Sequence, residues 1–168
     1  VISIDGFFGF LTQLVAAWIA LFLLYAGFLK SYGAFDLIMR LAFRSARYID
    51  SGIAQTAVLA SAVIGSVNGS QTANAGMTGS FTIPLMKRNG MKGETAGAIE
   101  AVASTSGQVL PPVMGAAAFI MASLITGVTY ADVIVAGLIP AAILVVTIAI
   151  AVHYVSVPQL DDVDPEIL

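Results

Sequence analysis

An uncharged stretch from Gly52 to Met86 constrains the fold of this chain most. At about 35 residues it is too short for two full membrane spans and a turn, because each span needs about 20. Its centre, Gly65–Ser80, reads GSVNGSQTANAGMTGS and is rich in glycine, hydroxyl and amide groups. Such backbone lies at membrane depth only where it is buried in protein or lines a polar cavity. We therefore predict a re-entrant hairpin, with Gly52–Ile64 entering, the polar run as a loop at the tip and Phe81–Met86 returning.

The composition places this stretch in a membrane protein. Hydrophobic residues make up 58% of the chain and charged residues 10%, and the mean hydropathy is +0.94, outside the range of soluble domains. The chain begins at Val1 and enters an apolar run without a basic segment or cleavage site, so we expect no signal peptide and interpret it as a piece of a longer polypeptide. The net charge of −3, the absence of cysteine and a single histidine argue against nucleic-acid binding, disulfides and a zinc centre.

Apolar length and charge divide the chain into segments. The run from Phe7 to Leu29 is about 23 residues, long enough to span a bilayer core of about 30 Å, and Lys30 closes it. Arg40, Arg44 and Arg47 then recur at helical spacing, which predicts a helix on the membrane interface or, alternatively, a connector helix packed on protein. The predicted segments are a transmembrane helix over 1–30, an interfacial cytoplasmic helix over 31–50, the re-entrant hairpin over 51–88, a broken transmembrane helix over 94–127, a transmembrane helix over 130–154 and an acidic tail or linker over 155–168.

The segment from Thr95 to Gly127 must also be interrupted. A straight helix of about 33 residues would be about 50 Å long, well beyond the bilayer core. Pro111 and Pro112 remove backbone donors and disfavour helix before them, while Gly107 adds backbone freedom. We therefore predict two half-helices separated by a break, Ala96–Thr105 and Val113–Thr126.

Basic residues flank the predicted hairpin on both sides. By the positive-inside rule both flanks lie in the cytoplasm, as a hairpin requires, because it returns to the face that it left. The first span then runs from outside to inside, and the last span, with a tyrosine near each end, returns to the cytoplasm. The flanking residues are Arg40, Arg44 and Arg47 before the hairpin and Lys87, Arg88 and Lys92 after it.

The two polar interruptions are predicted to be halves of one site. A broken membrane helix exposes carbonyl oxygens at one end and amides at the other, so it can bind a cation or an anion. Oxygen ligands without a carboxylate suit sodium better than calcium or a transition metal. Alternatively, the small residues serve helix packing alone, through pairs such as Gly65 with Gly69 and Gly93 with Gly97. The candidate sodium- or substrate-binding residues are Ser66, Asn68, Gly69, Ser70, Asn74, Ser104, Thr105, Gly107 and Gln108, with Pro111 and Pro112 forming the helix break.

Glu100 is the acid that lies well inside a predicted span, where an ionisable residue suggests function. It is about 9 Å of helix rise from Glu94 at the cytoplasmic flank, so it could reach water or pair with Lys92, and we interpret it as structural. A serine hydrolase with Ser70 as nucleophile would need a base within about 3 Å. The lone His153 lies at a helix end, which argues against this chemistry.

With these motifs laid out, the chain resembles the large membrane subunit of tripartite ATP-independent periplasmic (TRAP) transporters, in particular the fused permease associated with TAXI binding proteins. The resemblance covers nearly the whole chain. Asn68 and Ser106 depart from the expected pattern, but both are small or polar. The most specific matching parts are Gly69-Ser70 with Ala73-Asn74, the run TGSFTIPLMK from Thr78 to Lys87, EAVAST from Glu100 to Thr105 with Gly107-Gln108, and PPVMGAAAFIMA from Pro111 to Ala122.

The resemblance implies an all-α integral membrane protein and no enzyme activity. The chain would be one repeat of an inverted-repeat, elevator-type transporter, in which the hairpin tip and the following helix break hold one sodium ion. Sodium would be the coupling ion, with no other cofactor. The implied partners are a periplasmic substrate-binding protein, a small membrane subunit or its fused equivalent, the lipid bilayer and a small organic anion, and the implied location is the bacterial or archaeal cell (inner) membrane, as a multi-pass protein. The alternative function is a non-catalytic assembly subunit packed through small residues.

Overall fold

The computed structural model describes residues 9, 12–13, 16, 20–33, 37, 40, 44 and 52–160. Within these residues the regular structure is helical, with no strand, so the predicted all-α class is confirmed for the described part. The α-helices are α2 (Ala20–Ser31), α4 (Gly52–Asn68), α5 (Gln71–Arg88), α6 (Gly93–Thr105), α7 (Ala116–Leu124) and α8 (Tyr130–Leu160). A short 3₁₀ helix, η2 (Ser106–Gln108), follows α6.

The predicted hairpin consists of α4 and α5, which pack against each other and are joined by Gly69 and Ser70. Gly69 turns the chain with a φ of 63°, and the Ser70 hydroxyl caps α5 by accepting a bond from the Ala73 N–H at 3.3 Å. The interruption is shorter than predicted, because Gly65–Ser80 is helical on both sides of these two residues. The returning arm is therefore all of α5 and not Phe81–Met86 alone. Polar side chains of the run bond carbonyl oxygens of α5 and its neighbours, which offsets their low helix propensity.

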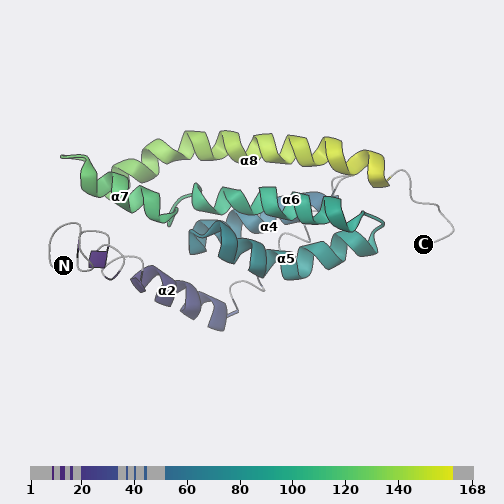
Figure 1. Cartoon of the computed structure of the whole chain (residues 1–168), viewed down its shortest axis with the longest axis horizontal. Coiled ribbons are helices and arrows are strands. Elements are labelled where there is room, and N and C mark those ends of the chain that lie inside the picture. Colours follow the sequence, from purple (N-terminus) through teal and green to yellow (C-terminus); the bar gives the residue numbers. More distant parts are fainter. Residues whose placement is uncertain are drawn as a thin grey trace.

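The second interruption lies in the region of the two prolines. After α6 and η2 the chain passes through the Pro111–Pro112 peptide, which is cis, and through Met114, whose φ is 55°. Gly115 is the N-cap of α7. The helices on either side follow one another along nearly the same direction in Figure 1. The break therefore covers the residues from η2 to Gly115, and α7 is shorter at both ends than the predicted Val113–Thr126.

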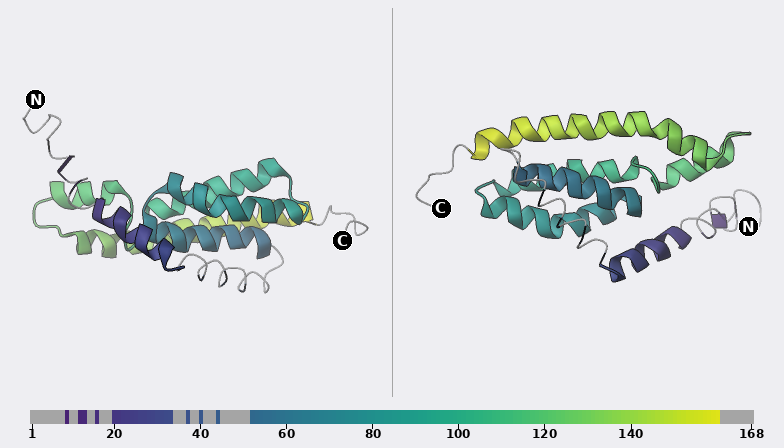
Figure 2. Two further views of the ribbon diagram at one scale, coloured as in Figure 1. Left: turned by 90° about the horizontal axis from the view of Figure 1, so that it is seen from below. Right: turned by 180° about the vertical axis from the view of Figure 1, so that it is seen from behind.

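The helices α4, α5, α6 and α8 enclose the apolar core. In Figure 1, α8 lies along α6 and α7, and α5 lies on the other side of α6. The helix α4 packs against α5, α6 and α8. The views from below and behind in Figure 2 agree, and α2 lies to one side, where it contacts α4. The core residues are Ala54, Ala57, Val58, Met86, Met91, Ala96, Ile99, Ala103, Ile148 and Val152.

One helix of the described part is long and apolar enough to cross a membrane. This segment, Tyr130–Pro158, lies within α8 and has only 11% of its most apolar window buried inside the protein. The helix α4 is apolar but shorter. The re-entrant placement of the hairpin, the inverted repeat and the multi-pass topology stay predictions.

The ends of the chain are described only in part. The helix α2 ends at Ser31, next to Lys30, where the first predicted span closes. Most of the preceding run, and all but isolated positions of the predicted interfacial helix over 31–50, lie outside the described residues. The helix α8 continues to Leu160, beyond the predicted end at Tyr154, and residues 161–168 of the predicted tail also lie outside them.

Candidate functional site

The hairpin meets the region of the second interruption at a pair of glycines, Gly65 on α4 and Gly107 in η2. A Cβ atom on Gly65 would lie 2.3 Å from the Gly107 Cα, and a Cβ on Gly107 would lie 2.7 Å from the Gly65 Cα. Any other residue at either position would force the backbones apart. Gly107 does not have a positive φ, so close approach, and not the predicted backbone freedom, explains the glycine there. The predicted packing role therefore holds for Gly65, whereas a Cβ on Gly97 would meet no atom within 4 Å.

The end of the hairpin also packs directly on the α6–α7 break. The Ser66 carbonyl oxygen accepts a hydrogen bond from the Val113 N–H at 3.1 Å. A Cβ on Gly69 would lie 1.9 Å from the Met114 carbonyl oxygen. The hairpin end and the break therefore form one unit, in which neither backbone can move without the other.

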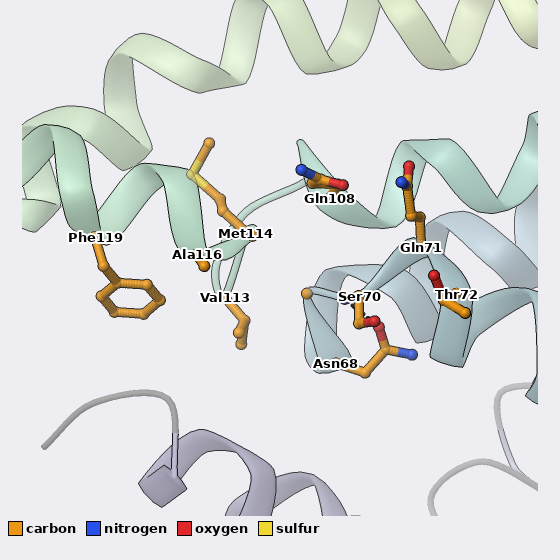
Figure 3. A pocket seen from close by; sticks show the side chains of 11 residues that line it. Asn68, Ser70, Gln71, Thr72, Gln108, Val113, Met114, Ala116 and Phe119 are labelled. Atoms are coloured by element: carbon orange, nitrogen blue, oxygen red, sulfur yellow. Dashed lines mark hydrogen bonds between the residues drawn. The ribbon is translucent and has the colours of Figure 1, made fainter. Parts of the chain in front are cut away.

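A cavity of about 410 Å³ lies where the hairpin end faces this break. In Figure 3 the labelled hairpin residues lie on one side of it, and those of the break and α7 lie on the other. Among the residues that the structure describes, no charged side chain lines the cavity. Its lining residues are the predicted Asn68, Gly69, Ser70 and Gln108, together with Gln71, Thr72, Val113, Met114, Gly115, Ala116 and Phe119.

Two helix N-termini contribute to this cavity. Gln71 and Thr72 are the first two residues of α5, and Ala116 is the first residue of α7. The N-terminus of a helix carries a partial positive charge and backbone N–H groups without partners inside the helix. The last residues of α4 and η2, Asn68 and Gln108, also line the cavity, so helix ends of both kinds meet there and supply backbone donors and acceptors.

Two buried polar side-chain atoms of the hairpin have no hydrogen-bond partner in the part of the chain that the structure describes. The first is Nδ2 of Asn68, whose Oδ1 accepts a bond from the Ser70 N–H at 2.8 Å. The second is Oδ1 of Asn74, a residue with no exposed surface. The first atom is a donor and the second is an acceptor.

The Asn74 side chain lies at the glycine crossing. Its Nδ2 donates to the carbonyl oxygens of Ser61 at 2.8 Å and Ser104 at 3.4 Å, and it lies 2.8 Å from the place where a Cβ of Gly65 would be. Carbonyl oxygens only accept hydrogen bonds, so the NH₂ group must face them and Oδ1 must point away. The amide therefore connects the hairpin to α6 and leaves its oxygen available.

The remaining predicted site residues use their hydroxyls within the protein. Ser66 and Thr105 donate to carbonyl oxygens of their own helices, Val63 O at 2.8 Å and Val102 O at 2.6 Å. Ser104 donates to the Glu100 carboxylate at 2.8 Å. The structure thus places Asn68, Gly69, Ser70 and Gln108 at the cavity and Asn74, Ser104 and Gly107 at the adjacent crossing, and it gives the side chains of Ser66 and Thr105 no such role.

Glu100 lies inside the protein and is 2% exposed. Its carboxylate accepts hydrogen bonds from hydroxyl groups on three helices and not from Lys92, so the pairing that the sequence suggested is wrong. The predicted access to water is also excluded by this burial. The donors are Ser61 of α4, Thr78 and Thr82 of α5, and Ser104 of α6.

The sequence did not point to Phe119 and Tyr130, which support the cavity wall. Their rings stack with centroids 4.4 Å apart and an interplanar angle of 7°. The Tyr130 hydroxyl, at the start of α8, donates to the carbonyl oxygens of Pro112 at 3.0 Å and Val113. The sequence indicated this tyrosine only as a residue near one end of the last predicted span. The signal that could have shown its second role is the proline pair, because its broken helix leaves carbonyl oxygens that need donors.

Comparison with known proteins agrees with this architecture. Residues 1–163 match the family described as the DctM component of the tripartite ATP-independent periplasmic transporter. The chain belongs to this family. It is also 31% identical over 120 residues to the uncharacterized protein y4mL of Sinorhizobium fredii (strain NBRC 101917 / NGR234). That alignment covers 71% of this chain and 28% of y4mL, so the chain spans little more than a quarter of its relative. No solved structure matches the chain.

Membership of the DctM family assigns the chain to the membrane component of a TRAP transporter. The predicted resemblance is therefore confirmed at the level of the family. Within this DctM chain, the hairpin α4–α5 and the α6–α7 break form the polar centre of the described region.

Proposed function

We propose that this chain is part of the membrane permease of a sodium-coupled secondary transporter, which takes up organic anions such as carboxylates delivered by a periplasmic binding protein. The family supports the transporter role. The observation that carries the finer proposal is the pair of buried atoms without partners in the hairpin, the Asn74 acceptor in α5 and the Asn68 donor at the cavity wall.

The unpaired Asn74 oxygen supports the proposal that the site binds a cation. An unpaired acceptor in a buried position costs about 1–3 kcal/mol, and a bound cation would offset this cost. The Asn74 oxygen is a neutral amide oxygen without a hydrogen-bond partner among the described residues. Such neutral oxygen donors suit sodium better than a transition metal.

The cavity supports the proposal that the substrate is an anion. Its volume of about 410 Å³ is within the range of small-molecule sites. The first residues of α5 and α7 line it and bring backbone N–H groups, and Asn68 in its wall has a buried Nδ2 without a partner. A carboxylate could accept from these N–H groups without a basic side chain in the lining.

The partners follow from the same proposal. A periplasmic binding protein would deliver the anion, and a small membrane subunit or a fused equivalent would complete the permease in a bacterial or archaeal inner membrane. The alternative, an assembly subunit packed through small residues, is favoured by one observation, the close approach of Gly65 and Gly107. The two functions differ in whether Asn74 affects sodium dependence.

The test is uptake by the complete permease and its binding protein in proteoliposomes, measured against sodium concentration. We expect Asn74→Ala to raise the half-saturating sodium concentration by about tenfold or more, because a contact to a charged group contributes about 1.5–3 kcal/mol. Ser123→Ala is the control. Its hydroxyl bonds only Phe119 O of its own helix, at 2.8 Å, so sodium dependence should be unchanged. An unaltered sodium requirement in folded Asn74→Ala would favour the assembly role.

A further inference from the structure

Glu100 has hydrogen-bond partners that connect it to the amide of Asn74. Its Oε1 accepts bonds from Ser104 at 2.8 Å, from Ser61 at 3.2 Å and from Thr78. The other oxygen, Oε2, accepts from Thr82. One carboxylate thus fixes hydroxyls on α4, α5 and α6 in a region without a charged partner among these contacts.

The same three residues that bond Oε1 also determine how Asn74 lies. The carbonyl oxygens of Ser61 and Ser104 accept from the Asn74 Nδ2, at 2.8 Å and 3.4 Å. The Thr78 hydroxyl lies 2.8 Å from the carbonyl oxygen of Asn74 itself. Ser61 and Ser104 therefore contact Glu100 through the hydroxyl and Asn74 through the carbonyl oxygen, whereas Thr78 contacts both residues through its hydroxyl. Every side-chain bond that the Asn74 amide makes is to a residue held by Glu100.

The orientation of the amide follows from this arrangement. Two carbonyl oxygens hold the NH₂ group, so Oδ1 faces the opposite direction and stays without a partner. If the Glu100 contacts were lost, Ser61 and Ser104 would be free to move with α4 and α6, and the Asn74 oxygen would no longer have a fixed direction. Glu100 itself is poorly suited to bind a cation directly, because Oε1 already accepts three hydrogen bonds.

We infer that Glu100 is a positioning residue for the cation site, acting through Ser61, Ser104 and Thr78 on the Asn74 oxygen. This inference rests on the proposed function, because it assumes that the Asn74 oxygen binds the coupling cation. The buried carboxylate then has two roles, because it holds three helices together and also affects the affinity for the cation.

The experiment compares Glu100→Ala with Glu100→Gln in the complete permease, by sodium-dependent uptake and by the rise in melting temperature that sodium causes in detergent. A glutamine oxygen can accept the bonds from Ser61, Thr78 and Ser104, and its NH₂ can donate to the Thr82 hydroxyl. We expect Glu100→Ala to raise the half-saturating sodium concentration by about tenfold or more, as loss of an outer partner does at metal sites. Glu100→Gln should keep a value close to that of the wild type.

A matched control separates positioning from general stability. Gln55 is also buried on α4, and its Nε2 donates to Ala149 O of α8 at 2.7 Å, so Gln55→Ala removes a helix–helix bond that does not involve Asn74. This variant should melt at a lower temperature with wild-type sodium dependence. Wild-type sodium dependence in folded Glu100→Ala would overturn the inference, as would equal losses in Glu100→Gln and Glu100→Ala. If the wild type itself shows no sodium dependence, the proposed function fails instead.

Discussion

Single atoms decide the geometry of the polar centre, and the contact between Gly65 and Gly107 is the clearest case. Neither position has room for a Cβ, since each would lie within 2.7 Å of the opposite Cα. The Asn74 amide fills the space beside them. The two glycines thus let two backbones approach closely enough for one amide to connect the hairpin and α6.

Alanine substitutions test this contact. Gly65→Ala should lower the stability of the protein by about 1–3 kcal/mol, because the added methyl group overpacks a closed crossing. Gly97→Ala is the control, since that glycine lies in α6 and its Cβ would meet no atom within 4 Å. It should gain about 0.5–1 kcal/mol from better helix propensity. Thermal unfolding in detergent measures both, and a wild-type melting temperature for Gly65→Ala would contradict the close contact.

At the scale of elements, the α6–α7 break is held open by its own sequence and by its neighbours. Pro111 and Pro112 cannot donate backbone hydrogen bonds, so the helix cannot continue through them undisturbed. The Val113 N–H donates to the Ser66 carbonyl of α4, and Tyr130 of α8 donates to the Pro112 carbonyl at 3.0 Å. The break is therefore a fixed structure that forms one wall of the cavity.

Replacing both prolines with alanine tests whether this wall is needed. The double variant restores two donors and permits α6 to extend, which would draw Val113 and Met114 away from the hairpin end. We expect normal insertion and an equal or higher melting temperature, but loss of sodium-driven uptake. Pro140→Ala in α8 is the matched control, because that proline is exposed and does not line the cavity. Wild-type sodium affinity in a folded double variant would show that the break is only a kink.

At the scale of the whole molecule, the helices present a large apolar surface. Most of the apolar window of α8 is exposed, and exposed side chains such as Ile139, Ile143 and Val146 cover it. Such a surface is stable against lipid or against the rest of a larger permease. The last turn of α5 carries Lys87 and Arg88, and the loop from α5 to α6 carries Lys92. Figure 1 shows this loop at the opposite end of the bundle from the α7–α8 loop.

Cysteine labelling tests the orientation that these charges predict. By the positive-inside rule, a cysteine replacing Lys92 should react only with reagents on the cytoplasmic side, and one replacing Thr126 only from outside. Both side chains are exposed, and this chain has no cysteine of its own. The experiment uses intact cells that express an otherwise cysteine-free permease. Labelling of the Lys92 position from outside would reverse the predicted topology.

The sequence alone determined the features that depend on local chemistry. Proline cannot donate, so Pro111 and Pro112 placed the α6–α7 break. The apolar composition indicated a membrane protein. Apolar length and charge predicted the end of α2 beside Lys30 and the start of α8 at Tyr130. Glycine, hydroxyl and amide content marked both halves of the polar centre, and Asn68, Ser70 and Gln108 do line the cavity.

Only the tertiary structure decided how far the helices extend and which polar atoms are left over. Asn74, Thr78 and Thr82 recur every four residues on one face of α5, a pattern that could have indicated a helix there. Their helical state is nevertheless set by partners on other helices, since they bond Glu100 and the carbonyl oxygens of Ser61 and Ser104. A hydroxyl or amide can bond water, its own backbone or a distant carboxylate, and the local sequence does not determine which. The packing of α4, α5 and α6 decides among these partners, and it leaves the Asn74 oxygen without one.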